Sequence, residues 1–183
     1  MAINTSALWL LTGPRGAGKT TFCSILACHA RLDGWDVAGV ISPAVMAGSE
    51  KTGILVEDLR TGEQHPLASA SLRKPFSMQL KDWHFDPLAL SWGNRILENC
   101  TPCDLLIVDE LGPLELLRNE GWTSALKILD QHGYRLGIAV VRPELQDILS
   151  KSLTIAGTIF IDRPTDLAAE ANRWWERLSG SEK

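Results

Sequence analysis

The chain has 183 residues, of which 45% are hydrophobic and 22% are charged, and its formal net charge is −4. We expect one globular domain over residues 1–183. The negative charge, with no block of like charges, disfavours duplex nucleic acid and anionic membranes as partners. No apolar run approaches the roughly 20 residues of a membrane-spanning helix, and the N-terminus lacks a basic signal-type region, so we expect a cytoplasmic protein.

The first predicted elements surround a glycine-rich loop near the N-terminus. Residues 7–11 form an apolar run that predicts a strand, and residues 19–32 carry apolar side chains at helical spacing. Gly34 follows this helix, at the position where a left-handed C-terminal cap is expected. Residues 36–41 predict a second strand, which gives the strand–helix–strand order of a parallel α/β unit.

The segment after the second strand shows a different pattern of apolar and polar residues. Residues 52–59 and 64–68 predict two strands joined by a polar turn over residues 60–63. This spacing favours an inserted β-hairpin over a parallel crossover. Residues 69–85 show no clear period, and we predict a loop there.

The rest of the chain again alternates helical and apolar patterns. Asp86 and Pro87 predict a helix start, because a carboxylate can cap the first turn and proline suits the first helical position. We expect Leu88, Trp92 and Ile96 on the core-facing side of that helix. The later elements are predicted as strands over 105–108, 136–141 and 158–161 and helices over 121–131, 143–149 and 165–178. This order predicts a three-layer α/β fold with a mainly parallel sheet.

The last predicted helix carries two adjacent tryptophans. Helical spacing places Trp174 on the same face as Leu167, Ala171 and Leu178, and we expect this face to be buried. Trp175 lies about 100° away around the helix axis, so we expect its side chain to be exposed.

The strongest signal is the glycine-rich loop between the first strand and the first helix. It reads Gly13-Pro14-Arg15-Gly16-Ala17-Gly18-Lys19-Thr20 and matches the phosphate-loop pattern G-x-x-x-x-G-K-[ST] at every fixed position. Glycines let the backbone wrap around phosphate groups, and the following helix adds the positive end of its dipole. We expect Lys19 to contact the β- and γ-phosphates and the Thr20 hydroxyl to bind Mg²⁺. Thr21 is either a polar helix-start residue or a neighbour of the α-phosphate, and Arg15 either covers the phosphates or points to solvent.

A second motif follows the buried strand over residues 105–108. The apolar run leads directly into Asp109 and Glu110, at the edge of the sheet where ligands bind in open α/β folds. We expect Asp109 to hold Mg²⁺ and Glu110 to take a proton from an attacking water. Glu115 is either an orienting group for this loop or a solvated carboxylate.

Two arginines at strand ends are further candidates. Arg142 follows the strand over residues 136–141, where it either stabilises negative charge on the γ-phosphate or forms an ordinary helix start. Arg163 follows the last strand, where its guanidinium could stack on a nucleobase. Cys100 and Cys103 have the spacing of a metal or redox pair, but one such pair is too few ligands for a zinc site, so we interpret them as ordinary thiols.

Taken together, the motifs resemble the small thermostable, cancer-related type of P-loop nucleoside-triphosphatase. The resemblance covers most of the chain. It rests on residues 13–21, on residues 39–68 and on the acidic motif Asp109-Glu110-Leu111-Gly112-Pro113-Leu114-Glu115-Leu116. It implies a RecA-like sheet and slow, Mg²⁺-dependent hydrolysis of ATP, GTP and other nucleoside triphosphates to diphosphate and phosphate.

The chain departs from this family in the stretch after the second strand. The family usually carries acidic residues and an arginine there, whereas this chain has Pro43, Ala44 and Met46. Lys51 alone keeps the basic character of the stretch.

We therefore predict a nucleoside-triphosphatase that uses Lys19, Glu110 and Arg142, with two alternatives. A nucleoside or nucleotide kinase uses the same loop, but it needs a lid with arginines, and residues 69–85 hold only Arg73, Lys74 and Lys81 as basic residues. A nucleotide-dependent switch would instead obtain its missing catalytic group from an unidentified protein partner.

Overall fold

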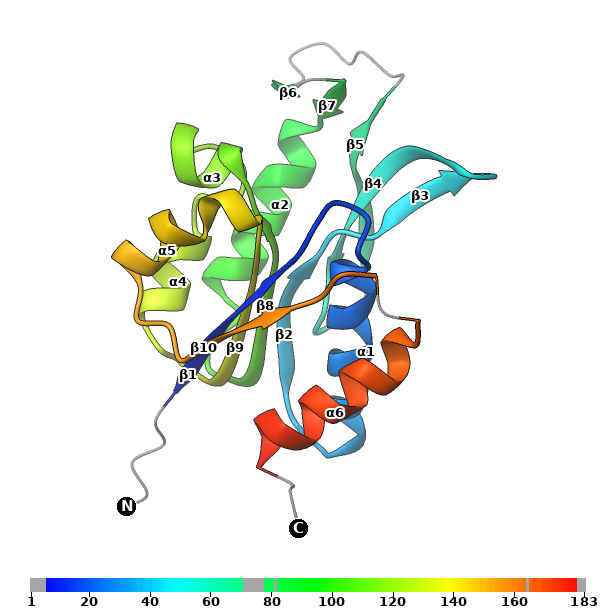
Figure 1. The fold of residues 1–183 in the computed structure, drawn as a ribbon. Helices are drawn as coiled ribbons and strands as arrows, with labels where there is room; N and C mark the ends of the chain where they lie inside the picture. The colour runs from blue at the N-terminus through cyan, green and yellow to red at the C-terminus, as the bar shows by residue number, and fades with distance from the viewer. Residues whose placement is uncertain (1–5, 71–77, 81, 164, 181–183) are drawn as a thin grey trace.

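We analysed a computed structural model of the chain, which describes residues 6–70, 78–80, 82–163 and 165–180. These residues form one ten-stranded sheet with helices on both faces (Figure 1). The strands are β1 (Ala7–Thr12), β2 (Val37–Ile41), β3 (Ala44–Ala47), β4 (Glu50–Asp58), β5 (Gln64–Ser69), β6 (Met78–Leu80), β7 (Trp83–Phe85), β8 (Cys103–Leu111), β9 (Tyr134–Val141) and β10 (Gly157–Phe160). The helices are α1 (Lys19–Leu32), α2 (Pro87–Glu98), α3 (Pro113–Arg118), α4 (Ala125–Asp130), α5 (Gln146–Ser152) and α6 (Leu167–Ser179), with a 3₁₀ turn at Pro143–Leu145.

The sheet has a parallel half and an antiparallel half. Strands β10, β1, β9, β8 and β2 lie side by side in that order, and all four pairs are parallel. The sheet continues from β2 through β4, β5, β7 and β6 in antiparallel pairs, and β3 pairs with β4. The predicted parallel core and inserted hairpin are confirmed, and the antiparallel half is larger than predicted.

The helices complete a three-layer arrangement. Helices α1 and α6 pack against each other and against one face of the parallel strands, where they share a core with β1, β8 and β9. Helices α2, α4 and α5 cover the other face, around a second core. Figure 1 shows these two groups on opposite sides of the sheet. The carboxyl ends of β1, β8 and β9 meet at one edge, which is where the motifs predict the site.

The structure corrects the predicted loop over residues 69–85. Residues 78–80 and 83–85 form the antiparallel pair β6–β7, and β7 extends the sheet beside β5. These strands are three residues long, which is too short for a period-2 pattern to be visible in the sequence. Residues 71–77 and 81, and with them Arg73, Lys74 and Lys81, lie outside the described residues. Strand β3 was also missed, because all four of its residues are exposed and no apolar alternation marks it.

Helix α2 begins as predicted, and Trp92 and Ile96 pack partly buried against the core as expected, but Leu88 does not. The Asp86 carboxylate accepts a hydrogen bond of 2.9 Å from the Leu88 backbone N–H, which confirms the cap. Leu88 itself is 80% exposed, and the buried positions are Ala89, Gly93 and Leu97. A Cβ atom at Gly93 would lie 2.4 Å from the Trp122 ring, so the helix approaches that ring closely through its glycine. Trp122 is buried in the core, and its ring lies against the most deeply buried face of the helix at Gly93.

In helix α6 the prediction for Trp175 is wrong, while Trp174 packs partly buried against the core. Trp175 is 4% exposed, while Trp174 is only half-buried. The Trp175 ring packs edge-on against Trp35 at 4.9 Å, and its Nε1–H donates a 2.7 Å hydrogen bond to Asp33. These partners lie just beyond helix α1, far away in the sequence, and they decide which tryptophan is buried.

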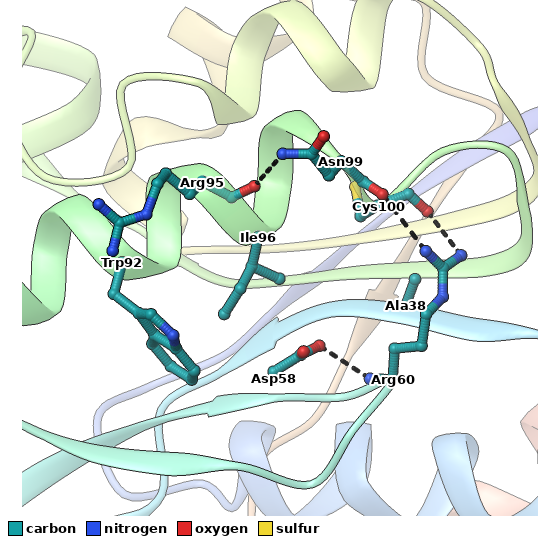
Figure 2. Close-up of a pocket in the computed structure, with 8 residues that line it drawn as sticks. All are labelled: Ala38, Asp58, Arg60, Trp92, Arg95, Ile96, Asn99 and Cys100. Atoms are coloured by element: carbon teal, nitrogen blue, oxygen red, sulfur yellow. Dashed lines mark hydrogen bonds between the residues drawn. The ribbon is translucent and has the colours of Figure 1, made fainter.

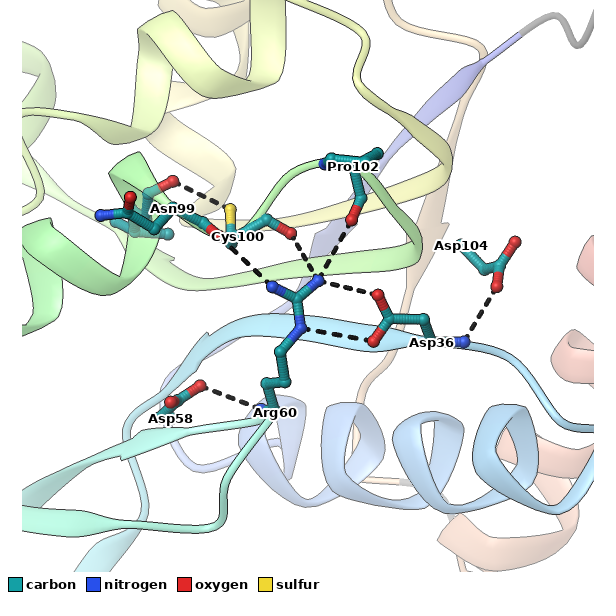
Figure 3. Close-up of polar contacts among 8 residues, drawn as sticks. Asp36, Asp58, Arg60, Asn99, Cys100, Pro102 and Asp104 are labelled. Atoms are coloured by element: carbon teal, nitrogen blue, oxygen red, sulfur yellow. Dashed lines mark hydrogen bonds and ion pairs between the residues drawn. The ribbon is translucent and has the colours of Figure 1, made fainter.

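The opposite end of the sheet is held together by Arg60, in the turn between β4 and β5. Its guanidinium donates to the Asp36 carboxylate and to three backbone carbonyls (Figure 3). The carbonyls belong to Asn99, Cys100 and Pro102. Arg60 therefore ties the hairpin to the segments that enter β2 and β8.

A cavity of about 270 Å³ lies beside Arg60, between helix α2 and strands β2 and β4 (Figure 2). Trp92, Ile96 and Ala38 contribute its apolar lining. It lies near the amino end of β2, away from the edge of the sheet that carries the glycine-rich loop and Asp109.

The two cysteines beside this cavity behave as ordinary thiols. Cys100 donates through Sγ to the Leu97 carbonyl oxygen at 2.9 Å. Burial raises the pKa of Cys100 to about 11 and the pKa of Cys103 to about 12, so both stay protonated at neutral pH. Among the described residues no group of three or more His, Cys, Asp or Glu side chains is placed to bind a metal. No helix in the described part of the chain is both long and apolar enough to span a bilayer.

Candidate active site

The glycine-rich loop at the end of β1 packs closely against the backbone that follows β10. Gly13 has a φ of +148°, and a Cβ atom there would lie 1.9 Å from the Ile161 carbonyl oxygen. Gly18 has a φ of +93° and is the N-cap of α1. No side chain among the described residues caps this helix, so its first backbone N–H groups are available to a ligand.

The Lys19 side chain lies inside the glycine-rich loop and binds its backbone. Its Nζ donates to the carbonyl oxygens of Gly13 at 2.9 Å and Pro14 at 3.1 Å. The residue is only 8% exposed, although it carries a positive charge. This arrangement holds the ammonium group within the loop, where an incoming phosphate would meet it.

Asp109 lies beside Thr20 at the end of β8. Its carboxylate accepts a hydrogen bond from the Thr20 side chain and one of 3.2 Å from the Ser42 backbone N–H. The residue is 2% exposed, and burial raises the pKa of its carboxyl group to about 6, against the lowering effects of the two hydrogen bonds.

This pair of oxygen groups fits a hard divalent cation. Mg²⁺ prefers carboxylate and hydroxyl oxygen ligands, and it usually binds through one or two carboxylates together with substrate phosphates. The Asp109 carboxylate is buried, and its destabilised charge would be compensated by such a cation. The predicted metal residues Thr20 and Asp109 are therefore brought together.

Ser42 is a site residue that the sequence reasoning missed. Its hydroxyl donates to the Asp109 carbonyl oxygen at 2.7 Å, in addition to the backbone contact with the carboxylate. Ser42 directly follows β2, the parallel neighbour of β8. No local signal could have found it, because the contact depends on β2 lying beside β8, where the carboxyl ends of neighbouring parallel strands meet.

Glu110 and Arg142 form an ion pair at the same edge. The Arg142 Nε donates to Glu110 Oε1 at 2.6 Å, and both side chains are partly exposed. Strands β8 and β9 are adjacent, so their ends bring the predicted base and the predicted phosphate-contacting arginine into direct contact.

Glu115 acts on the loop that follows Glu110. Its carboxylate accepts hydrogen bonds from the backbone N–H groups of Gly112 at 2.8 Å and Trp122 at 3.0 Å. Burial raises the pKa of Glu115, while these two hydrogen bonds oppose the shift. Of the two roles considered, the orienting one is correct, and the solvated carboxylate is wrong.

The remaining predicted contacts lie at the rim of the site. Arg15, Gly16 and Thr21 are exposed, whereas Ala17 is buried against the core beneath the loop. Arg163 is also exposed, and its guanidinium lies 3.5 Å from the Arg15 carbonyl oxygen. The segment after β10 thus lies next to the glycine-rich loop.

Comparisons with known proteins agree with this geometry. A family model described as NTPase matches residues 9–160. A nucleoside-triphosphatase THEP1 from Ignicoccus hospitalis is 29% identical over 161 residues, which is 86% of this chain and 90% of the relative. One of the same name from Methanothermobacter thermautotrophicus is 32% identical over 76% of this chain and 79% of the relative.

Solved structures show the same fold. The solution structure of a human cancer-related nucleoside triphosphatase superimposes with a TM-score of 0.69 at 19% identity, covering 97% of this chain and all of that one. THEP1 from Aquifex aeolicus gives a TM-score of 0.66 at 15% identity, with 96% and 99% of the two chains covered. With the family model matched over most of its length, this chain belongs to the P-loop NTPase family that includes the THEP1 proteins.

Proposed function

We propose that the protein hydrolyses nucleoside triphosphates, ATP and GTP among them, to the diphosphate and phosphate in a Mg²⁺-dependent reaction. The observation that carries the proposal is the buried Asp109 carboxylate against Thr20, beside a loop closed by Lys19. The names of the THEP1 relatives support the same reaction.

Some of the site residues bind the substrate and the metal, and one transfers a proton. The loop amides and Lys19 hold the phosphates, and Thr20 and Asp109 hold Mg²⁺, which supplies charge neutralisation on the phosphate oxygens when bound. Glu110 takes a proton from the attacking water, whose oxygen forms the new bond to the γ-phosphorus. The bond from that phosphorus to the β–γ bridging oxygen breaks, and the diphosphate leaves. Arg142 stabilises the charge that develops on the γ-phosphate.

The nucleobase would lie near Arg163, after the last strand. A guanidinium stacks on any planar base, and its exposed position next to the glycine-rich loop leaves room for a purine of either kind. Such an arrangement would accept ATP and GTP alike, which supports the proposed broad substrate range.

A partner-dependent switch is the second candidate, and one observation favours it. The proposed base Glu110 is engaged by Arg142 at 2.6 Å. A protein partner that drew Arg142 away, or that supplied another cation, would release the carboxylate. On this reading the chain alone binds nucleotide and turns it over poorly.

Phosphate release from purified protein tests both candidates. We expect slow release of phosphate from Mg²⁺–ATP and Mg²⁺–GTP, with no diversion of phosphate when nucleosides or nucleoside monophosphates are added. Transfer of phosphate to such an acceptor would identify a kinase instead. Tight binding without release would favour the switch.

A further inference from the structure

Lys51 lies on the hairpin that extends beyond the carboxyl edge of the sheet. Strand β4 pairs with β2 only through Glu57 and Asp58, so its N-terminal part continues past the end of β2. Lys51 is near the start of that overhanging part, opposite Met46 of β3. The hairpin thus brings a basic residue to the edge of the sheet that carries the glycine-rich loop and Asp109.

The Lys51 ammonium group is within electrostatic range of the charged groups of the active site. It interacts electrostatically with the carboxylates of Asp109 and Glu110 and with the guanidinium of Arg15. These groups belong to the end of β8 and to the glycine-rich loop. Lys51 is therefore close enough to respond to the charges on both sides of the proposed phosphate position.

The same ammonium group has no fixed anionic partner. Among the described residues it forms no hydrogen bond or ion pair, and its Nζ lies 5.3 Å from the centre of the Trp83 ring. The side chain is about half-buried, and desolvation lowers the Lys51 pKa. The aromatic face holds a partly dehydrated cation in position. An anion that approaches the cation stabilises its charge further.

Two other cations of the site already have partners, whereas Arg15 is exposed. Lys19 donates to the carbonyl oxygens of Gly13 and Pro14, and Arg142 is paired with Glu110. A bound triphosphate would bring several negative charges to the loop, with the terminal phosphate at the end farthest from the nucleobase. Lys51 is the cation that can meet this phosphate from the hairpin side, opposite the loop amides.

We propose that Lys51 binds the terminal phosphate of the bound nucleoside triphosphate, and that Trp83 holds its ammonium group in place. This role rests on the proposed function. It makes Lys51 selective for the triphosphate over the diphosphate, because the diphosphate lacks the group that Lys51 contacts. Strand β7 would then contribute to the site through Trp83, its first residue.

The test compares affinities for a non-hydrolysable ATP analogue and for ADP, both with Mg²⁺. Lys51→Met keeps an unbranched side chain of nearly the same length but removes the ammonium group, and with it the charge and the cation–π contact with Trp83. We expect it to weaken analogue binding by about 10–100-fold, the worth of one hydrogen bond to a charged group. ADP affinity should change by no more than about twofold, which is under 0.5 kcal/mol. Lys51→Arg should restore most of the analogue affinity.

Lys127→Met is the matched control, because Lys127 is exposed on α4 in the layer of helices behind the sheet. Thermal unfolding of each variant verifies that it folds. An equal loss of analogue and ADP affinity, or no loss of either, overturns the role of Lys51. A parent protein that binds the analogue but releases no phosphate refutes hydrolysis, while the affinity ratio still decides on Lys51. A parent that binds neither nucleotide overturns both proposals.

Discussion

The Nε atom of Arg142 lies 2.6 Å from Oε1 of Glu110, at the carboxyl ends of the adjacent strands β9 and β8. Each residue therefore satisfies the charge of the other at the place where water and the γ-phosphate would meet. The pair is partly exposed, so its intrinsic contribution to stability is small. In the proposed mechanism its position makes it a functional contact, and its consequences can be measured.

Arg142→Met should lower turnover while leaving nucleotide affinity almost unchanged. In the proposed mechanism the guanidinium interacts with charge that develops only in the transition state, and removing such a donor costs about 10²–10³-fold in kcat. Single-turnover hydrolysis at saturating Mg²⁺–ATP measures the loss, and equilibrium binding measures the affinity. Faster turnover in Arg142→Met would show that the arginine restrains Glu110, as the partner-dependent switch requires.

Lys19→Ala should remove most of the nucleotide affinity and leave the protein folded. The lysine donates only to the loop carbonyls of Gly13 and Pro14, so its loss opens the loop without exposing the core. Titration with a fluorescent ATP analogue measures binding, and circular dichroism verifies the fold. An affinity equal to that of the parent would disprove the assignment of the loop as the phosphate site.

Arg60→Lys should destabilise the protein without affecting the active site. Lysine keeps the charge but cannot reproduce the fork that reaches Asp36 and the carbonyls before β8. Because the side chain is 38% exposed, solvent screening limits the loss to about 1–2 kcal/mol. Urea unfolding measures it, with Arg118→Lys on the exposed end of α3 as the control. A change in ATP affinity would contradict the separation of the two ends of the sheet.

The parts of the site that the sequence predicted are those encoded by consecutive residues. The glycine-rich loop and the Asp109-Glu110 motif each need only one strand and the turn after it, so their patterns are complete in the sequence. The contact between Arg142 and Glu110 depends on β9 lying beside β8, and the contact of Ser42 depends on β2 lying on the other side of β8. No local pattern specifies the order of parallel strands.

The errors in the fold have the same origin. Helical spacing identifies a face of α6, but Trp35 and Asp33 decide that Trp175 is the buried tryptophan. In α2 the close approach of Gly93 to Trp122 rotates the contact face away from Leu88. In both helices the partner is a bulky side chain from a distant segment, which periodicity within the helix cannot reveal.

Asp109→Asn should stabilise the metal-free protein at neutral pH. Burial raises the Asp109 pKa from 3.8 to about 6. The folded protein therefore binds this proton more tightly than the unfolded chain, and at pH values below the unfolded pKa this adds fully to the free energy of unfolding. The contribution is lost as pH rises through about 6. Asparagine does not titrate, so the variant avoids this loss. Above pH ~7 its free energy of unfolding should exceed that of the parent by something on the order of 3 kcal/mol. Near pH ~4 the two proteins should have similar free energies of unfolding. Urea unfolding with EDTA at both pH values measures the difference, and a variant that is less stable at neutral pH would contradict a carboxylate whose charge is destabilised by burial.

Glu110→Gln provides the sharpest test of the mechanism, because glutamine keeps the size of the side chain but cannot accept the proton. Nucleotide binding should survive, and turnover should fall by about 10²–10⁴-fold, the usual effect of a positioned acid–base group. A loss confined to kcat indicates an interaction made only in the transition state. Single-turnover hydrolysis at saturating Mg²⁺–ATP measures the rate, with Glu120→Gln, an exposed residue after α3, as the control.

The double variant Glu110→Gln with Arg142→Met separates the two remaining explanations. If both residues act on the same transition state as a unit, the double variant should lose little more than Glu110→Gln alone, because coupled catalytic groups are not additive. If Arg142 only holds Glu110 away from the water, its removal should have no effect once the base is absent but should accelerate the parent. If instead Glu110→Gln retains a rate within about threefold of the parent, far above that expected after loss of a base, then Glu110 has no role in proton transfer. Hydrolysis would then depend on phosphate positioning and Mg²⁺ alone, and the ion pair with Arg142 would be the contact through which a partner controls the site.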